Sequence, residues 1–165
     1  MNASNLQLSV TQPQKTLGDG YLQFQLNKST TAVFSIEFTQ EVLVLPIETI
    51  TSIPNTSELI LGLMNWRNRL IWVIDLPRMF SLESQVSRIR RCNIIIIDRE
   101  GETMGLMVPE IKGTVRLNSN TIQKESNQVT PHILPYLKGC IWHEDELNLV
   151  LNIQAILKSL FLQNK

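Results

Sequence analysis

The side chains of this chain best suited to chemistry are its two cysteines, Cys92 and Cys140, and its two histidines, His132 and His143. Cys140 and His143 stand three residues apart, a spacing found in half of a zinc site or in a thiol–imidazole nucleophile. On a strand, residues three apart point to opposite faces, so this pair cannot grip one ion. A nucleophilic cysteine would also need an adjacent base and an oxyanion-stabilising loop. We therefore predict no metal, no cofactor and no catalytic residue, and keep a small thiol-dependent hydrolase using Cys140 and His143 as the alternative.

A second candidate chemistry is the stacking of nucleic-acid bases. Trp66 and Trp72 alternate with Arg67 and Arg69, a combination that can bind single strands. The chain has 15 basic and 15 acidic residues, however, so its formal net charge is zero. No broader basic stripe accompanies the two arginines. We therefore predict core tryptophans, exposed arginines and no nucleic-acid partner.

Charge is nevertheless uneven along the chain. Residues 66–91 contain six arginines and two acids, whereas residues 29–65 contain four acids and neither lysine nor arginine. Once folded, these stretches could offer one acidic and one basic face to different partners, or simply form ordinary solvated surfaces.

Length and composition place the chain among compact globular proteins. It has 165 residues, of which 43% are hydrophobic and 18% charged, enough for one unit with two small subdomains. Two cysteines make no disulfide framework. Residues 1–10 lack the basic start and apolar run of a secretory signal, and no stretch approaches a membrane span. We expect a cytoplasmic protein without membrane insertion.

Short β-branched and apolar runs bounded by Gly, Pro, Asn or Asp dominate the chain and predict strands. Residues 94–97 are apolar on both faces, which suggests a strand near the middle of the molecule. Residues 153–162 predict the one longer helix, packed through Ile153, Ile156, Leu157 and Leu160. The predicted strands are 21–26, 31–35, 42–45, 63–66, 70–74, 91–98, 104–108, 114–117, 137–143 and 147–151.

These elements predict an all-β, barrel-like architecture. Residues 1–20 are polar and are expected to form a flexible lead-in. Residues 21–165 would then form the domain, and the serine-rich segment at 81–90 is the expected division between two five-stranded sets.

The most informative stretch lies between residues 53 and 80. Pro54 begins a turn, and residues 57–61 are expected to form a short helix that Gly62 ends. Two apolar strands follow, joined by a tip at Arg67–Arg69 in which Asn68 tolerates a left-handed backbone. Arginines on such a tip suggest a recognition element rather than a catalytic one.

The stretch resembles the core of CheW-like domains, the adaptors of bacterial chemosensory arrays. The resemblance extends from about residue 21 to residue 160 and includes an opening strand, a Gln-Glu-Val signature and a closing hairpin and helix. The matching positions of the core are Pro54, Asn55, Gly62, Asn65, Arg67, Asp75 and Leu76. Elsewhere they are residues 21–26, Gln40, Glu41, Val42, residues 104–108 with Gly105, residues 136–139 and residues 149–153.

This resemblance implies two intertwined five-stranded SH3-like barrels with short helices and a C-terminal helix. It implies a non-enzymatic adaptor that couples a chemoreceptor cytoplasmic tip to the regulatory domain of a CheA-type histidine kinase, for chemotaxis, phototaxis or pilus motility. The implied partner-binding residues are Glu41, Asn65, Trp66, Arg67, Asn68 and Arg69, and the implied structural residues are Pro54, Gly62, Asp75 and Gly105. Asp75 would cap the helix that begins near Leu76.

Three positions depart from the family pattern. Asn68 replaces a glycine, Trp66 replaces a leucine and Pro109 replaces an aspartate. Trp66 is expected to give the tip a bulkier apolar surface, and Pro109 removes both a carboxylate and an N–H group. The chain is therefore expected to be a divergent, stand-alone member with its own dedicated partners.

Overall fold

The structure, a computed structural model, describes residues 18–124 and 129–163. All ten predicted strands are confirmed, most with one to four further residues at an end. The predicted lead-in at residues 1–20 lies mostly outside the described residues, and Asp19 and Gly20 already belong to the first strand. The strands are β1 (Asp19–Asn27), β2 (Thr30–Ser35), β3 (Thr39–Pro46), β4 (Ile60–Trp66), β5 (Arg69–Asp75), β6 (Arg91–Arg99), β7 (Glu102–Val108), β8 (Glu110–Leu117), β9 (Leu137–His143) and β10 (Glu146–Leu151).

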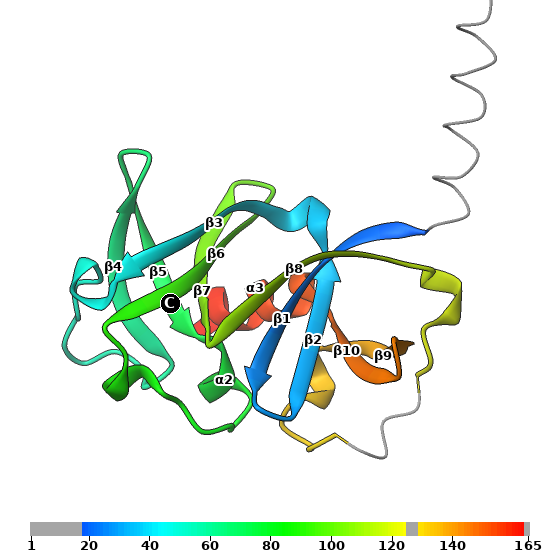
Figure 1. Ribbon diagram of the computed structural model, residues 1–165. Helices are drawn as coiled ribbons and strands as arrows, with labels where there is room; N and C mark the ends of the chain where they lie inside the picture. Colours follow the sequence, from blue (N-terminus) through cyan, green and yellow to red (C-terminus); the bar gives the residue numbers. More distant parts are fainter. Residues whose placement is uncertain (1–17, 125–128, 164–165) are drawn as a thin grey trace, which may run out of the picture.

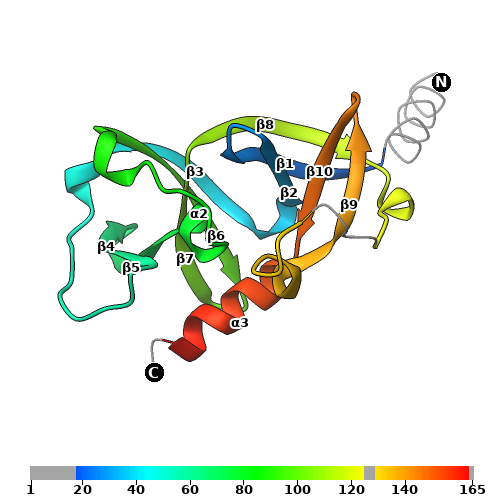
Figure 2. The same ribbon diagram turned by 90° about the horizontal axis from the view of Figure 1, so that it is seen from below.

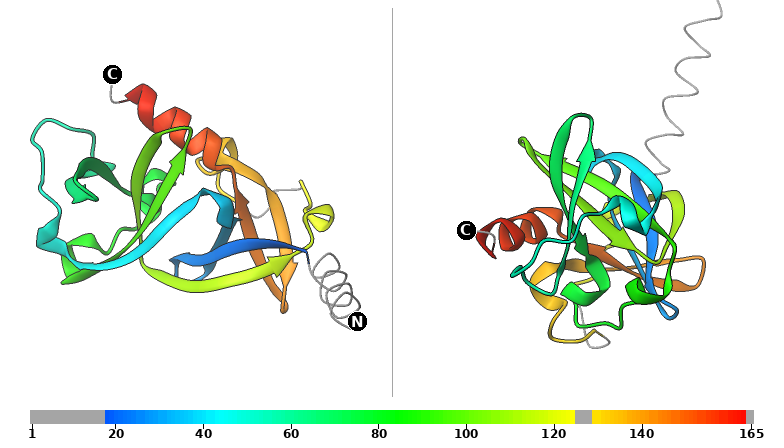
Figure 3. Two further views of the ribbon diagram at one scale, coloured as in Figure 1. Left: turned by 90° about the horizontal axis from the view of Figure 1, so that it is seen from above. Right: turned by 90° about the vertical axis from the view of Figure 1, so that its left-hand side faces the viewer.

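The strands form two five-stranded sheets, each curled into a barrel. One sheet has the order β8-β1-β2-β10-β9, and we call it the terminal barrel; the other has the order β3-β6-β7-β5-β4, and we call it the central barrel. Paired backbone bonds between Gln123 and Cys140 and between Thr51 and Leu63 extend the terminal and central barrels respectively beyond their named strands. The two barrels lie side by side along an elongated molecule (Figures 1 and 3). The predicted all-β class with two five-stranded subdomains is confirmed.

The predicted division at residues 81–90 is wrong. That segment joins β5 to β6, which both belong to the central barrel. The chain instead leaves the terminal barrel after β2 and returns to it at β8. Parallel pairing of β2 with β10 brings the segment before the central barrel together with the segment after it. The central barrel is therefore inserted in sequence between two parts of the terminal barrel, and the subdomains are nested rather than consecutive.

Strand β6 faces two hydrophobic cores at once. Its four isoleucines, residues 94–97, are all fully buried. Ile94 and Ile96 point into the interior of the central barrel, whereas Ile95 and Ile97 point into a core shared by both barrels. This alternation explains the run of apolar residues and confirms the expected position of the strand in the middle of the molecule.

Helix α3 (Ile153–Gln163) closes the shared core, as Figure 2 shows from below. Ile153, Ile156, Leu157 and Leu160 are buried in that core, which confirms the predicted helix face. Among the described residues, no helix combines the length and the apolar character needed to cross a bilayer.

The predicted helix at residues 57–61 is wrong. Pro54 and Asn55 form a turn in which Asn55 is left-handed (φ 64°), and the chain enters β4 at Ile60. Five residues are too few to form a stable helix alone, and pairing with β5 satisfies the backbone instead. Gly62 lies inside β4, at a bulge with φ 149°, where a Cβ atom would stand 2.0 Å from the Thr51 carbonyl oxygen.

A row of polar groups crosses the terminal barrel. Gln23 on β1 donates to the Asn148 side chain on β10 at 2.8 Å, and both residues are buried. The hydroxyl of Thr31 donates to the carboxylate of Glu146, whose other oxygen lies 3.5 Å from the Lys112 ammonium. The pKa of Glu146 is lowered, and the hydrogen bond from Thr31 is the largest cause. Burial acts in the opposite direction and raises the pKa, whereas the Lys112 charge lowers it further.

Replacing Gly62 with alanine should destabilise the fold sharply because the added methyl group meets the Thr51 carbonyl. Gly113 is the matched control: its φ is also positive, at 125°, but no atom lies within 4 Å of its added Cβ. We expect Gly62→Ala to lower the free energy of unfolding by about 2 kcal/mol more than Gly113→Ala, because only the first adds a clash to the backbone strain. Urea denaturation measures both. Equal losses in the two variants would contradict the proposed close approach.

The ionised form of Glu146 should stabilise the fold in a pH-dependent way. Because its folded pKa is lowered, its contribution is present above the unfolded pKa of about 4.3 and disappears as the pH falls through the folded pKa. We expect wild type to be more stable than Glu146→Gln at pH 7, with the difference shrinking below about pH 4.3. Denaturation at pH 7, 5, 4 and 3 measures the gap, with the exposed Glu102→Gln as control. A gap that widens in acid would contradict the argument.

Candidate partner-binding site

The hairpin between β4 and β5 projects from the central barrel (Figures 1 and 3). Its tip consists of Arg67 and Asn68, with φ values of 50° and 63°. Two successive left-handed residues are typical of the tight two-residue turn that matches strand twist. Arg69, expected at the tip, is instead the first residue of β5 and pairs with Trp66.

The backbone of the tip is held by a side chain. The Asn65 side-chain oxygen accepts the Asn68 N–H at 3.1 Å, so this asparagine supports the turn. Arg67 adopts a left-handed conformation that costs a non-glycine residue about 1 kcal/mol. Such strain in an exposed residue is a reason to look for a function.

Three side chains form a cluster at the base of the tip, which we call the Glu41–Trp66–Arg67 cluster. The Trp66 indole N–H donates to a Glu41 carboxylate oxygen at 2.9 Å, and the Arg67 guanidinium lies 3.5 Å from that same oxygen. The guanidinium also stacks over the Trp66 ring, 4.6 Å from its centroid. Glu41 comes from β3, so this contact spans 25 residues of sequence and orients Arg67.

Trp66 itself is only 7% exposed. The expectation that it gives the tip a bulkier apolar surface is therefore wrong, because its ring packs into the central barrel under the guanidinium. Burial also removes it as a platform for stacking bases. Arg67 remains accessible, with 63% of its side chain exposed, and Glu41 is 39% exposed.

Three aliphatic residues close in sequence to the members of the cluster have exposed side chains. Their exposure could not be predicted from the sequence. Leu70, three residues after Arg67, is 69% exposed, and Val42 and Val44 project from β3. In the sequence, residues 42–45 are uniformly apolar, so the pattern could not show which side faces water. The packing of β3 settles the question, because Leu43 and Leu45 lie against the central-barrel core and the alternate residues Val42 and Val44 face outward.

The remaining predicted structural residues lie away from the tip. Asp75 is fully buried and accepts the Arg78 N–H at 3.4 Å, which confirms it as the cap of the short helix α2 (Leu76–Met79). Its second oxygen accepts the Ser84 hydroxyl and so ties down the following loop. At Gly105 on β7, a Cβ atom would stand 3.0 Å from Ile94, so glycine permits close packing between strands.

The arrangement around the cysteines is unsuited to thiol chemistry. Cys92 and Cys140 are both buried, and burial raises the pKa of each thiol, which disfavours the nucleophilic thiolate. His143 is the last residue of β9, and its imidazole lies 3.8 Å from the carboxylate of Glu144 on the following turn. Within residues 18–124 and 129–163, no three His, Cys, Asp or Glu side chains are grouped so that they could hold a metal ion.

Known proteins share both the sequence pattern and the fold of this chain. The family model of the CheW-like domain matches residues 20–161. The chemotaxis protein CheW of Thermotoga maritima is 22% identical over 155 residues, which cover 88% of this chain and 95% of that protein. The crystal structure of the scaffolding protein TtCheW from Thermoanaerobacter tengcongensis superposes with a TM-score of 0.70 and 25% identity, covering 81% of this chain and 88% of that one.

The match to the family model covers most of the chain, and the two nested barrels with their closing helix agree with the solved relative. The chain is therefore a member of the CheW-like family.

Proposed function

We propose that this protein is a non-enzymatic chemotaxis adaptor that couples chemoreceptors to a CheA-type histidine kinase. Family membership and the relatives named as chemotaxis and scaffolding proteins support an adaptor role. On this proposal the partners are the receptor cytoplasmic tip and the kinase regulatory domain, and the protein works in the cytoplasm. The motility output is chemotaxis, phototaxis or pilus movement.

The observation that carries the proposal is the Glu41–Trp66–Arg67 cluster. Arginine anchors dominate many protein interfaces because a planar guanidinium makes several directed bonds. Here the guanidinium is stacked on Trp66 and paired with Glu41 before any partner arrives, so little side-chain freedom is lost on binding. Arg67 still exposes most of its side chain to a partner.

The surroundings of the cluster suit a protein partner. Leu70 lies on the same hairpin, and Val42 and Val44 follow Glu41 on β3, so exposed aliphatic groups accompany the charged anchor. Stable interfaces combine apolar contact area with a few oriented polar anchors. Asn65, Asn68 and Arg69 are exposed around the tip and complete the proposed contact set.

The alternative, a thiol-dependent hydrolase, lacks an equivalent observation. Its nucleophile, Cys140, would have to be an accessible thiolate, yet the residue is buried and its pKa is raised. The double change Cys140→Ser and His143→Ala separates the two functions, because it abolishes a hydrolase while an adaptor keeps its binding.

Arg67→Ala should separate binding from stability. The Arg67–Glu41 pair is exposed, and such pairs contribute at most about 1 kcal/mol, so thermal unfolding should remain close to that of wild type. Loss of a pre-organised arginine anchor costs about 2 kcal/mol or more in binding, which is roughly a thirtyfold loss of affinity. Calorimetry with the cognate receptor tip and with the kinase regulatory domain measures the effect on each partner.

The matched control is Lys138→Ala, an exposed cation on β9 of the other barrel. It should leave both affinities unchanged. If Arg67→Ala folds normally and binds both partners as tightly as wild type, the tip is not the binding site.

A further inference from the structure

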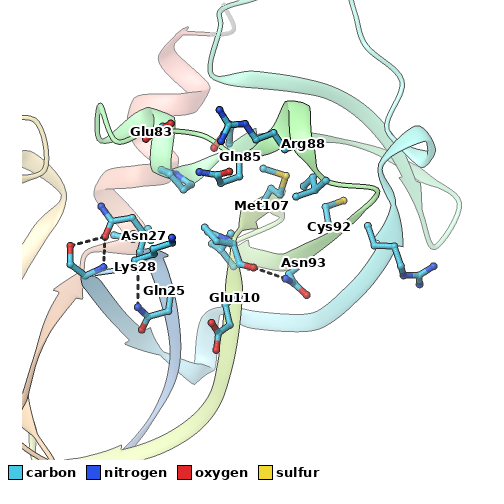
Figure 4. A pocket seen from close by; sticks show the side chains of 18 residues that line it. Gln25, Asn27, Lys28, Glu83, Gln85, Arg88, Cys92, Asn93, Met107 and Glu110 are labelled. Atoms are coloured by element: carbon cyan, nitrogen blue, oxygen red, sulfur yellow. Dashed lines mark hydrogen bonds between the residues drawn. The ribbon is translucent and has the colours of Figure 1, made fainter.

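A groove of about 990 Å³ lies between the two barrels, where the chain crosses from β7 to β8 (Figure 4). Its lining comes from the end of β1 and the turn into β2, from the loop after α2, and from the crossing of β6, β7 and β8. None of the residues that line it belongs to the Glu41–Trp66–Arg67 cluster. The groove is therefore a second surface, separate from the proposed tip site.

The groove has an apolar floor and a polar rim. Leu26, Cys92, Met107 and Val108 are buried residues that contribute to its lining. Amide and charged side chains from several segments surround them, including those labelled in Figure 4. This composition, mostly apolar at depth with a few polar groups around it, is typical of binding clefts.

Two cations reach the groove from two different segments. Lys28 is in the β1–β2 turn, and Arg88 is in the loop before β6. Both are exposed, and within the described parts of the chain neither forms an ion pair. Arg91 also lines the groove, but its guanidinium donates to the Val44 carbonyl on β3 at 3.2 Å. Buried Asp75, which also borders the groove, is already engaged by the Arg78 N–H. Two separate cations that reach one groove suit a carboxylate ligand.

Two acids limit the kind of anion that fits. Glu83 and Glu110 also line the groove, on different sides in Figure 4. A polyanion such as a nucleic acid would be repelled by these carboxylates. A single acidic side chain within an otherwise apolar segment can contact the cations and avoid both acids.

Two strand ends lack partners on the side of the groove. The last β6–β7 pair is Asn93 with Val108, so Arg91 and Cys92 extend beyond it. The last β1–β8 pair is Gln25 with Glu110, so the final two residues of β1 extend beyond that pair as well. On their other sides these ends pair with β3 and β2. On the side of the groove, within the described chain, no strand pairs with them, and Pro109 there leads from one barrel to the other. Unpaired strand edges are sites where an extended peptide can add as a strand.

We propose that the groove binds an extended segment of a partner protein, in which an acidic side chain is flanked by aliphatic ones. The segment adds along the free end of β6 at Arg91 and Cys92. Its aliphatic side chains rest on the floor formed by Leu26, Met107 and Val108, and its carboxylate is held by Lys28 and Arg88.

A display library of random linear octapeptides, selected on the full chain, tests this. Enriched peptides should carry Asp or Glu between aliphatic residues, and amide shifts in NMR should fall on residues 26–28, 85–93 and 107–110. Arg88→Glu and Lys28→Glu should each weaken the binding of the best peptide at least about tenfold. The control Lys138→Glu should bind as wild type does, and all three variants should keep the wild-type unfolding midpoint.

N-methylation of alternate peptide amides tests the strand geometry. Only one of the two alternating registers should abolish binding, because an added strand turns every second N–H toward its partner. Equal loss or equal retention in both registers overturns strand addition.

Three other outcomes overturn the proposed site: no peptide is enriched, the enriched peptides lack an acid, or binding to Arg88→Glu and Lys28→Glu is unchanged. Each of these outcomes is independent of whether the hairpin tip binds its own partners.

Discussion

The fold depends on the burial of both faces of β6. Each isoleucine from residue 94 to 97 is fully buried, two in the core of the central barrel and two in the core that the barrels share with α3. Burying one such side chain contributes about 1.5–3 kcal/mol. β6 therefore packs the central barrel against the terminal barrel. A shift of either barrel relative to the other would leave a cavity next to β6.

This constraint also fixes the candidate site. β6 pairs with β3 on one side and with β7 on the other, and β7 carries the β5–β4 hairpin. Glu41 at one end of this sheet and Trp66 at the other therefore meet only because the sheet curls into a barrel. The Arg67 guanidinium takes its position from that closure, so the rigid barrel sets the geometry of an exposed side chain.

Much of this could be predicted from the sequence, because strands and turns are encoded locally. The strand runs, the cap at Asp75 and the left-handed Asn68 depend on neighbouring residues alone. The nesting of the barrels could not be predicted in this way, because the partner of β2 is β10, more than a hundred residues away. Gly62 was misinterpreted because its glycine requirement comes from a tertiary contact and not from a helix end: the Thr51 carbonyl lies beside it, where Thr51 pairs with Leu63. The burial of Trp66 likewise follows from Glu41 and the barrel interior.

The parallel pairing of β2 with β10 has a consequence for the order in which the chain can fold during synthesis. The strands of the central barrel are contiguous in sequence, from Thr39 to Val108, so that barrel can close while the rest is still being made. The β1–β2 hairpin emerges first but must wait for Leu151 before its sheet is complete. Closing so long a loop is slow, and an early hairpin with open edges is exposed meanwhile to other nascent chains. The nested topology thus links the solubility of newly made protein to how fast residues 110–151 arrive after the central barrel.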